Sequence, residues 1–432
     1  MNKKKAEDLM KFIDGSPSVY HAIKNTKEFL EKNGFKHLCR KETFELKPEG
    51  KYFVTNNGSA LIAWQMPKCG TAEKGFRIVG SHSDSPTFRI KPNPEITVQN
   101  HFLKLNTEVY GGAIVSTWFD RPLSAAGRVV LRTKDLLNPE VKLIDFDKAL
   151  LTIPNLAIHM NREINDGYSY NFQKDTLPLI AIINEKFQKD NFLVKLMAEE
   201  LKVNEDDILD FDLYLYDRQP GCFIGLNDEF FSVGRIDNLG MAYASIDALI
   251  SSKSSDFVQV AAIFDNEEVG SRTAQGAGSP FLQDILQRII ISTSTKNPFE
   301  EMQKALGYSF LISADQAHGL HPNYPEKNDI TNFPLMNKGP AIKLAASMSY
   351  TSDGISAGIF KDICMRAKIP FQNFVNRSDM RGGSTIGPIS VSNLNIKSVD
   401  IGNPILAMHS VRELGGTEDQ YYITRIFEEF YK

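Results

Sequence analysis

The chain has 432 residues. A single hydrophobic core rarely supports a chain of this length, so the length predicts two domains. Hydrophobic residues make up 42% and charged residues 24% of the chain, which is typical of globular proteins and argues against a disordered or membrane protein. The formal net charge is -4, and the one basic run lies at residues 3–5. The positive surface that nucleic-acid binding needs is therefore missing, and we expect no nucleic-acid partner.

The cysteines and the N-terminal segment indicate the compartment. The four cysteines are far apart and form no CxxC pair, so we expect reduced thiols instead of a thiolate zinc site or a redox motif. The N-terminal segment alternates charged and apolar residues and lacks the apolar run of a signal peptide. No segment reaches the roughly 18 apolar residues that span a membrane. We expect a cytosolic protein with no membrane partner.

The first predicted elements are a helix, a hairpin and a strand. The Ser-Pro pair at 16–17 is typical of a helix start, and apolar residues at helical spacing follow it as far as Gly34. Residues 51–66 are predicted to form a β-hairpin around an Asn-Asn-Gly turn, because Asn and Gly tolerate positive φ. The apolar run FRIVG at 76–80 is predicted to be a short strand.

The middle of the chain has a different pattern from the C-terminal part. Residues 93–232 contain many short β-like runs and one helical stretch near 190–201, which predicts an inserted, β-rich, barrel-like domain. From residue 234 onward strands and helices alternate, and this predicts a mostly parallel sheet with helices on both faces. The predicted fold class is α/β, with one domain formed by residues 1–92 and 233–432.

Side chains able to bind a metal come directly after four of the predicted strands. In an open α/β sheet, ligands bind beyond the carboxyl ends of the strands, so these side chains are predicted to meet at one edge. In chain order they are His82 and Asp84 after FRIVG, Glu267 and Glu268 after VQVAAIF, Asp315 after SFLIS, and His409 beyond KSVDI.

Two of these strand exits carry pairs of neighbouring polar residues. His82 and Asp84 are two residues apart, so both lie on one side of an extended backbone, and Asp84 could fix the tautomer of a metal-binding His82. Of Glu267 and Glu268, one could bind a metal while the other accepts a proton from bound water, and their spacing leaves the division of roles open. Each pair alone is more typical of a surface loop or a helix start.

The remaining candidates are also ambiguous one by one. Asp237 could be a bridging ligand or a helix N-cap, His318 and His321 could be a metal pair or surface residues, and His409 could lie in the core. Together the histidines and carboxylates fit zinc or cobalt, and manganese as well, since oxygen donors dominate. A bridging acid would imply two ions about 3.5–4 Å apart, an arrangement suited to amide hydrolysis.

Eight stretches closely resemble the aspartyl aminopeptidase and vacuolar aminopeptidase I family of dinuclear zinc metallopeptidases. They occur in order and cover nearly the whole chain. The stretches are SHSDSPTFRIKP (81–92), YGGAIVSTWFDRPLSAAGRV (110–129), IPNLAIHMNRE (153–163), GRIDNLG (234–240), FDNEEVGS (264–271), SADQAHGLHPNY (313–324), DMRGGSTIGPI (379–389) and PILAMHSVRE (404–413).

The resemblance implies a three-layer α/β/α zinc-exopeptidase domain, interrupted by a β-rich oligomerisation domain and assembled into a homododecamer around its active sites. It implies that Asp237 bridges two zinc ions and that Glu267 is the general base. The other ligands that it implies fall into two pairs, His82 with Asp315 and Glu268 with His409.

The resemblance also implies substrate contacts. Lys343 matches a lysine that faces the acidic side chain of the first substrate residue, and Tyr350 follows it in the same segment. His159, in the inserted domain, is implied to approach an active site of a neighbouring subunit, either as a substrate contact or as a metal ligand. His318 and His321 are implied to lie at the pocket rim or at a subunit contact.

We therefore expect an aminopeptidase that removes an N-terminal residue from peptides, with Asp or Glu preferred. The segment after Lys343 departs from the family pattern by lacking an Arg, and Gly382 stands where a Cys is usual, so broad or neutral specificity is an alternative. A deacylase or carboxypeptidase on the same fold is a second alternative. A catalytically silent peptide-binding shell is a third, disfavoured because all five ligand positions are filled.

Overall fold

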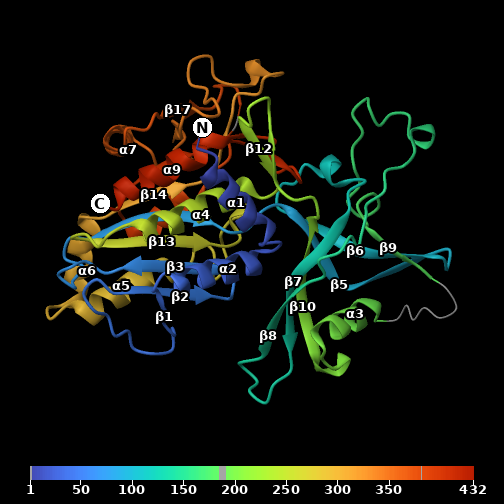
Figure 1. Ribbon diagram of the computed structural model, residues 1–432, viewed down its shortest axis with the longest axis horizontal. Helices are drawn as coiled ribbons and strands as arrows, with labels where there is room; N and C mark the ends of the chain where they lie inside the picture. Colours follow the sequence, from blue (N-terminus) through green and yellow to red (C-terminus); the bar gives the residue numbers. More distant parts are fainter. Residues whose placement is uncertain (1, 184–190, 381) are drawn as a thin grey trace.

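The computed structural model describes residues 2–183, 191–380 and 382–432 (Figure 1). A nine-stranded mixed sheet has the order β1-β2-β3-β13-β4-β14-β18-β16-β17. Four adjacent strands at its centre are parallel, so their carboxyl ends lie at the same edge: β13 (Val258–Phe264), β4 (Phe76–His82), β14 (Phe310–Ala314) and β18 (Lys397–Gly402). The flanking strands are β1 (Lys36–His37), β2 (Lys51–Asn56), β3 (Ala60–Gln65), β16 (Ala341–Leu344) and β17 (Gln372–Val375).

Helices cover both faces of this sheet, which gives the predicted α/β/α layers. All seven residues of β13 are buried, as expected for a strand covered on both sides. One apolar cluster joins the sheet to α2 (Val19–Lys32), α4 (Ile236–Ser251), α7 (Gly354–Ala367) and α9 (Thr417–Phe430). A second cluster, on the opposite face, includes residues of α5 (Phe281–Thr293), α6 (Pro298–Gly307) and α8 (Ile386–Leu394). Helix α1 (Lys4–Asp14) packs against α9 and α4.

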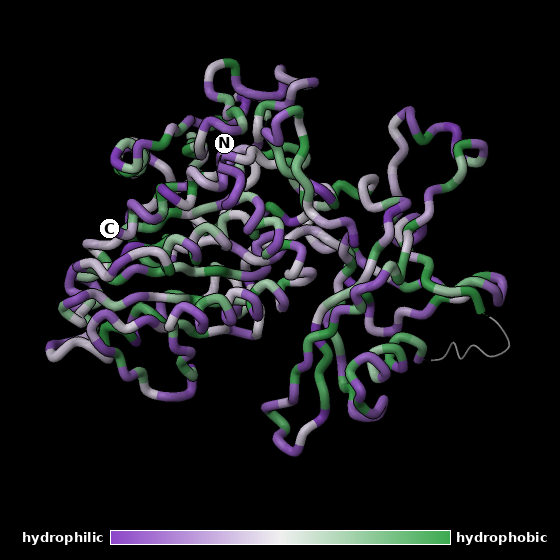
Figure 2. The backbone as a smooth tube through the Cα atoms, viewed as in Figure 1, coloured by the Kyte–Doolittle hydropathy of each residue, from purple (hydrophilic) through white to green (hydrophobic). Residues whose placement is uncertain are grey.

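A second, antiparallel sheet forms a separate body beside the first (Figure 1). Single bridges from Leu151 to Leu123 and from Thr152 to Leu179 link its edge strand β9 back to the start of β7, which makes it barrel-like. Helix α3 (Phe192–Leu201) packs against its apolar residues, and the strands around β7 and β10 are largely hydrophobic (Figure 2). In spatial order the strands are β8 (Glu140–Asp145), β7 (Leu123–Leu131), β10 (Ile208–Asp217), β5 (Thr87–Val98), β6 (Phe102–Tyr110) and β9 (Leu179–Ile182).

A third, five-stranded sheet was not predicted from the sequence. The predicted inserted segment, 93–232, spans most of the second sheet, whose strands begin at Thr87 and end at Asp217. The next two strands, β11 and β12, pair with each other, and β12 also pairs with β20 from the end of the chain. In spatial order the third sheet consists of β11 (Cys222–Ile224), β12 (Phe230–Val233), β20 (Glu413–Gly416), β19 (Pro404–Leu406) and β15 (Ala317–His318).

The local predictions near the N-terminus are mostly confirmed. The hairpin of β2 and β3 has the predicted turn. The first predicted helix begins later than expected, because the extended residue at its N-cap is Ser18 and the Ser-Pro pair lies before it. The helix predicted near 190–201 is α3, and residue 190 lies outside the described residues. In the described parts of the chain, no helix has the length and apolar character needed to cross a membrane.

Asp419, in the first turn of α9, ties this helix to the loop that precedes β16. Its buried carboxylate accepts hydrogen bonds from the backbone N–H groups of Asn337 (2.6 Å) and Gly339 (3.0 Å). Burial raises the pKa of Asp419 to about 7. The folded protein therefore holds a proton that the unfolded chain releases at lower pH.

This proton predicts a pH-dependent contribution to stability. The contribution is fully present below the ordinary pKa of an aspartate and is lost as the pH rises through about 7. We expect Asp419→Asn, which cannot ionise, to have a lower free energy of unfolding than the parent at pH 5. At pH 8 this gap in unfolding free energy should be smaller by roughly 1–3 kcal/mol. Urea unfolding of both proteins at the two pH values measures this gap, and a gap independent of pH would contradict the assignment.

Candidate active site

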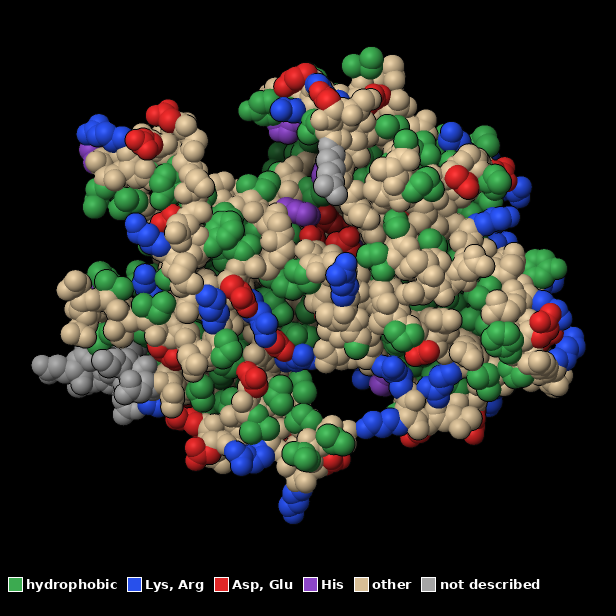
Figure 3. Space-filling view, turned by 180° about the vertical axis from the view of Figure 1, so that it is seen from behind, with side chains coloured by type: hydrophobic (Ala, Val, Ile, Leu, Met, Phe, Trp, Pro, Cys, Tyr) green, Lys and Arg blue, Asp and Glu red, His purple; other side chains and the backbone are tan. Residues whose placement is uncertain are grey.

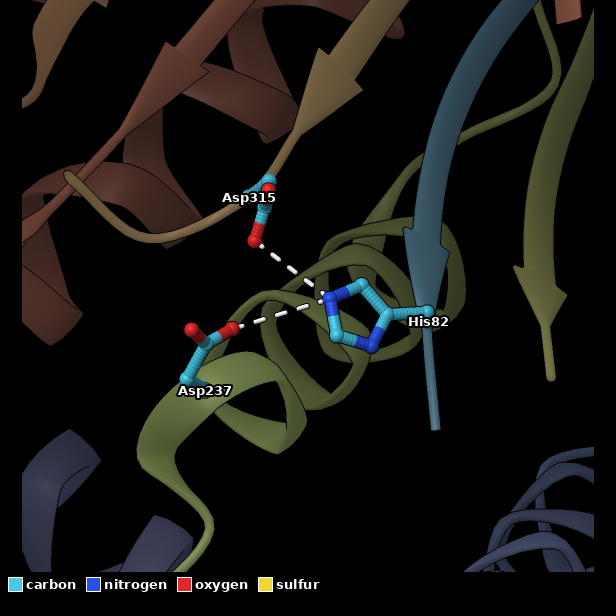
Figure 4. Close-up of side chains that lie close together, drawn as sticks. All are labelled: His82, Asp237 and Asp315. Carbon is cyan, nitrogen blue, oxygen red and sulfur yellow. Dashed lines mark hydrogen bonds and ion pairs between the residues drawn. The ribbon is translucent and has the colours of Figure 1, made fainter. Parts of the chain in front are cut away.

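Three of the predicted residues meet at the carboxyl edge of the central strands (Figure 4). His82 is the last residue of β4, Asp315 follows β14, and Asp237 lies at the start of α4. The Nε2 atom of His82 is 3.4 Å from Oδ1 of Asp315 and 3.6 Å from Oδ1 of Asp237. All three side chains are largely buried, so the predicted convergence of strand exits is observed here.

The second oxygen of Asp237 faces a different group of residues. Its Oδ2 atom is 3.5 Å from Nε2 of His409, and the same nitrogen is 3.4 Å from Oε1 of Glu268. Potential ligand atoms of Asp237, Glu268 and His409 all lie within 4.8 Å of one another, as do those of the group in Figure 4. Two clusters of histidine and carboxylate groups therefore share Asp237.

Unsatisfied oxygen atoms in these clusters point to a cation. Oδ1 of Asp237 and Oε1 of Glu268 are buried and accept no hydrogen bond. Such atoms are costly unless a positive group satisfies them. Burial and the nearby charge of Asp237 raise the pKa of Glu268 to about 7. The mixture of imidazole nitrogen and carboxylate oxygen is a donor set that zinc accepts, so the residues present fit a divalent metal.

Each histidine is held through the ring nitrogen that faces away from the clusters. Nδ1 of His82 donates to the carbonyl oxygen of Asp84 at 3.1 Å and lies 3.3 Å from the Oδ1 atom of Asp84. Nδ1 of His409 donates to the carbonyl oxygen of Gly112 at 3.1 Å. With Nδ1 protonated, the Nε2 lone pair of each ring is free to bind a metal, as is usual for histidine ligands.

The Asp84 carboxylate also holds the segment that carries the two glutamates. Its Oδ1 atom accepts from the backbone N–H of Glu267, and Oδ2 accepts from that of Glu268, each at 3.1 Å. The hydroxyl of Tyr110 donates to Oδ2 at 2.7 Å and accepts from the side-chain amide of Asn266 at 2.9 Å. Asp84 therefore lies behind the site and connects His82 with the Glu267–Glu268 backbone.

A cavity of about 340 Å³ opens in front of the clusters. Figure 3 shows acidic and histidine side chains at the bottom of a hollow on this face of the molecule. Burial, in a region rich in other carboxylates, raises the pKa of Glu267 to about 8. The cavity wall combines charged, aromatic and apolar side chains, among them those of Glu267, His318, Lys343, Tyr350, Phe374 and Met408.

Lys343 is a buried cation in this wall. Its side chain is 4% exposed, and its Nζ atom lies 3.5 Å from Oδ2 of Asp315 and 5.7 Å from the ring centre of Tyr350. The structure thus places Lys343 and Tyr350 in the cavity, as a substrate contact requires. It also pairs the lysine with one of the candidate metal ligands.

Two of the predicted histidines lie away from the cavity of this chain. His159 is exposed on a short 3-10 helix (Ile158–Met160) that projects from the second sheet. His321 accepts a hydrogen bond from the backbone of Asn323 at 3.2 Å and packs near Tyr324. Within the described residues of one chain, neither histidine lines the cavity, whereas His318 does.

Sequence reasoning did not single out Tyr110, Gly112 or Glu413. Tyr110 and Gly112 support the site from the end of β6, and Glu413 hydrogen-bonds to backbone groups of the clusters. All three lie in stretches that carry the family resemblance, namely 110–129 and 404–413. Their positions in the sequence gave no sign of a role, because they act through hydrogen bonds that only the folded chain creates.

Comparisons with known proteins identify the family of this chain. The sequence model of the aminopeptidase I zinc metalloproteases (M18) matches residues 12–431. A relative from Clostridium acetobutylicum, named probable M18 family aminopeptidase 2, is 52% identical over 426 residues, covering 99% of this chain and 98% of that protein. This chain belongs to the M18 aminopeptidase family. It is therefore a metallo-aminopeptidase, and the deacylase, carboxypeptidase and silent-shell alternatives find no support.

Solved structures of the M18 type have the same fold. The structure of the Ape4 and Nbr1 complex matches with a TM-score of 0.95 and 36% identity, covering 99% of this chain and 85% of that chain. The S. cerevisiae mApe1 dodecamer matches with a TM-score of 0.86 and 26% identity, covering 99% and 96% of the two chains. The mixed α/β architecture of this M18 chain is thus shared with both.

The hydrogen bond from Tyr110 to Asp84 predicts an effect on activity. Because Tyr110→Phe removes one of the donors that hold the buried carboxylate behind His82, we expect kcat/KM of the aminopeptidase to fall about tenfold or more. Steady-state hydrolysis of an aminoacyl anilide measures this. Tyr216→Phe is a matched control, because the Tyr216 hydroxyl donates to Asp145 in the same sheet, and Asp145 belongs to neither cluster. Equal losses in both variants would contradict a role for Tyr110 in the active site.

Proposed function

We propose that this M18 aminopeptidase removes N-terminal residues from peptides at a dinuclear metal site in which Asp237 bridges the two ions. The observation that carries the proposal is the position of the Asp237 carboxylate, whose two oxygen atoms face His82 and His409 at 3.6 and 3.5 Å. His82 and Asp315 would complete one site, and Glu268 and His409 the other. His159 of a neighbouring subunit is an additional candidate ligand or substrate contact.

The proposed metals are two zinc ions, with cobalt or manganese as substitutes. The donor set supports zinc, and so does the zinc metalloprotease family that matches the chain. Bound divalent ions lower the pKa of water and polarise a carbonyl oxygen. The chain itself supplies the proton transfer: Glu267 accepts a proton from the attacking water and passes it to the leaving amine. The free amino group of the substrate would dock against nearby carboxylates.

The proposed substrate preference is an acidic N-terminal residue. Lys343 is a buried cation in the cavity wall, where low solvent access strengthens pairing with a substrate carboxylate. Broad or neutral specificity remains the alternative, and two observations favour it. Lys343 already pairs with Asp315, and Phe374 and Met408 give the cavity an apolar side.

We also propose that the chain self-associates, as a homododecamer. The mApe1 dodecamer, which shares this fold, supports this proposal, and so does the exposure of His159 on an element that projects from the second sheet. In such an assembly His159 would reach the active site of a neighbour, while His321 would lie at a rim or subunit contact. The cytosolic location stays a prediction from the sequence.

Glu267→Gln tests the general base. Because the amide cannot accept the water proton, we expect kcat to fall by about 10²–10⁴-fold while the zinc content stays at the parent value. Anilide hydrolysis and elemental analysis of the same preparations provide the two readouts. Glu300→Gln, at an exposed position on α6, is the control and should match the parent in both. Parental activity in the Glu267→Gln enzyme would exclude this role.

Substrate preference is tested with Asp-, Glu- and Leu-anilides. If Lys343 selects acidic residues, the parent should have a higher kcat/KM for the Glu-anilide than for the Leu-anilide. In Lys343→Gln this Glu-to-Leu ratio should fall about tenfold, which corresponds to the loss of one charge-assisted hydrogen bond. Replacing Lys343 also disturbs Asp315, but any loss of activity from that disturbance affects both substrates equally and therefore cancels in the ratio. A parent that prefers Leu, or an unchanged ratio, would favour neutral specificity.

A further inference from the structure

Glu413, the first residue of β20, links two separate segments of the metal clusters. Its side chain is 2% exposed. The Oε2 atom accepts a hydrogen bond from the backbone N–H of Asp237 at 2.9 Å, and Oε1 accepts one from the backbone N–H of His409 at 2.7 Å. One carboxylate thus holds the main chain at both residues, which are far apart in the sequence.

Both backbones held by Glu413 have conformations that their own elements do not stabilise. His409 has φ of 69°, in the left-handed region that side chains other than glycine rarely adopt. Such a residue costs about 1–3 kcal/mol unless its surroundings enforce it. Asp237, with φ of -81° and ψ of 105°, is not helical although it lies at the start of α4. The bonds to Glu413 hold the N–H groups of both residues, while Ser85 and Ile114 donate to the carbonyl oxygens of Asp237 and His409 at 2.6 and 2.9 Å. Tertiary contacts, with Glu413 common to both residues, therefore fix this backbone geometry.

The location of Glu413 is a costly one for a carboxylate. It is buried beside Asp237, another carboxylate, and like charges at short range repel each other. An apolar residue would fill this position without that cost. The two backbone donors offset part of the cost, and the geometry that they secure joins the candidate bridging ligand to a histidine of the second cluster.

We propose that Glu413 is a positioning residue of the metal centre, which sets the distance between Asp237 and His409 so that both clusters can bind metal at once. This inference rests on the proposed dinuclear site. Among the described residues, Glu413 is not part of the cavity wall in front of the clusters, and it acts through the backbone of Asp237 and His409. Its loss should therefore weaken metal binding, most strongly in the cluster of Asp237, Glu268 and His409.

The chain contains a matched control for this proposal. Asp419 is equally buried and also accepts hydrogen bonds from two backbone N–H groups. Its donors are Asn337 and Gly339, which belong to neither metal cluster. Replacing either acid by its amide keeps the shape and leaves one N–H facing an NH₂ group instead of an acceptor. The two substitutions thus remove similar bonds, and only one of them supports the clusters.

The test compares the parent with Glu413→Gln and Asp419→Asn at pH 7.5. Competition with a chromogenic chelator gives the zinc dissociation constants, and elemental analysis gives the number of zinc ions bound per chain. Thermal unfolding scans give the Tm of the metal-free and the zinc-loaded proteins. We expect Glu413→Gln to weaken the second zinc about 10–100-fold and to shrink the zinc-induced rise in Tm. Asp419→Asn should lower both Tm values together and leave the dissociation constants unchanged.

The outcomes separate this inference from the function on which it rests. Zinc affinities of Glu413→Gln within twofold of the parent, or losses equal to those of Asp419→Asn, would overturn the role of Glu413. A parent that binds one zinc or fewer would overturn the dinuclear proposal instead. If the Gln variant does not fold, Glu413→Asp provides the test, because it keeps both acceptor oxygens on a shorter side chain. We expect its zinc affinity to fall at least about threefold. Zinc affinity equal to that of the parent would overturn the positioning role of Glu413.

Discussion

The arrangement of Asp237 between two histidines is the constraint on which the rest of the site depends. A buried carboxylate with one oxygen that accepts no hydrogen bond is unstable by itself, and here it has another carboxylate cluster on each side. Positive charge between these groups removes the conflict. The fold therefore concentrates acidic side chains at one sheet edge in a way that a bound cation would stabilise, and this supports the proposed dinuclear site.

The second sheet is part of this site as well as a separate body. Tyr110, at the end of β6, donates to Asp84, and the carbonyl oxygen of Gly112 accepts from His409. Space is tight at this corner: Gly111 has φ of +71°, and a Cβ atom there would lie 3.1 Å from Cβ of Glu268. Hydrogen bonds and close packing from the second sheet thus help to position His409 directly, and His82 and Glu268 through Asp84 and Gly111.

Several parts of the fold and the site could be predicted from the sequence. Apolar runs such as VQVAAIF specified buried strands, and the polar residues directly after β4, β13 and β14 specified which edge of the sheet carries the candidate site. His409 lies farther from β18, because β19 comes between them. Parallel pairing of β13, β4, β14 and β18 then brings His82, Glu268 and Asp315 close together. The third sheet escaped prediction because its strands are short and pair across the whole length of the chain.

The sequence by itself predicted the family through eight stretches that resemble it, and the α/β class through the alternation of strands and helices. Most of the metal-binding candidates followed from their positions after predicted strands, while the bridging role of Asp237 came from the resemblance alone. Tertiary structure decided which carboxylate is shared, which carbonyl oxygen holds each histidine, and that Lys343 lies beside Asp315. It also revealed Glu413, whose two bonds join Asp237 to His409. These features are hydrogen bonds and distances between residues far apart in the chain, and no local pattern encodes them, because they exist only after the sheets have packed together.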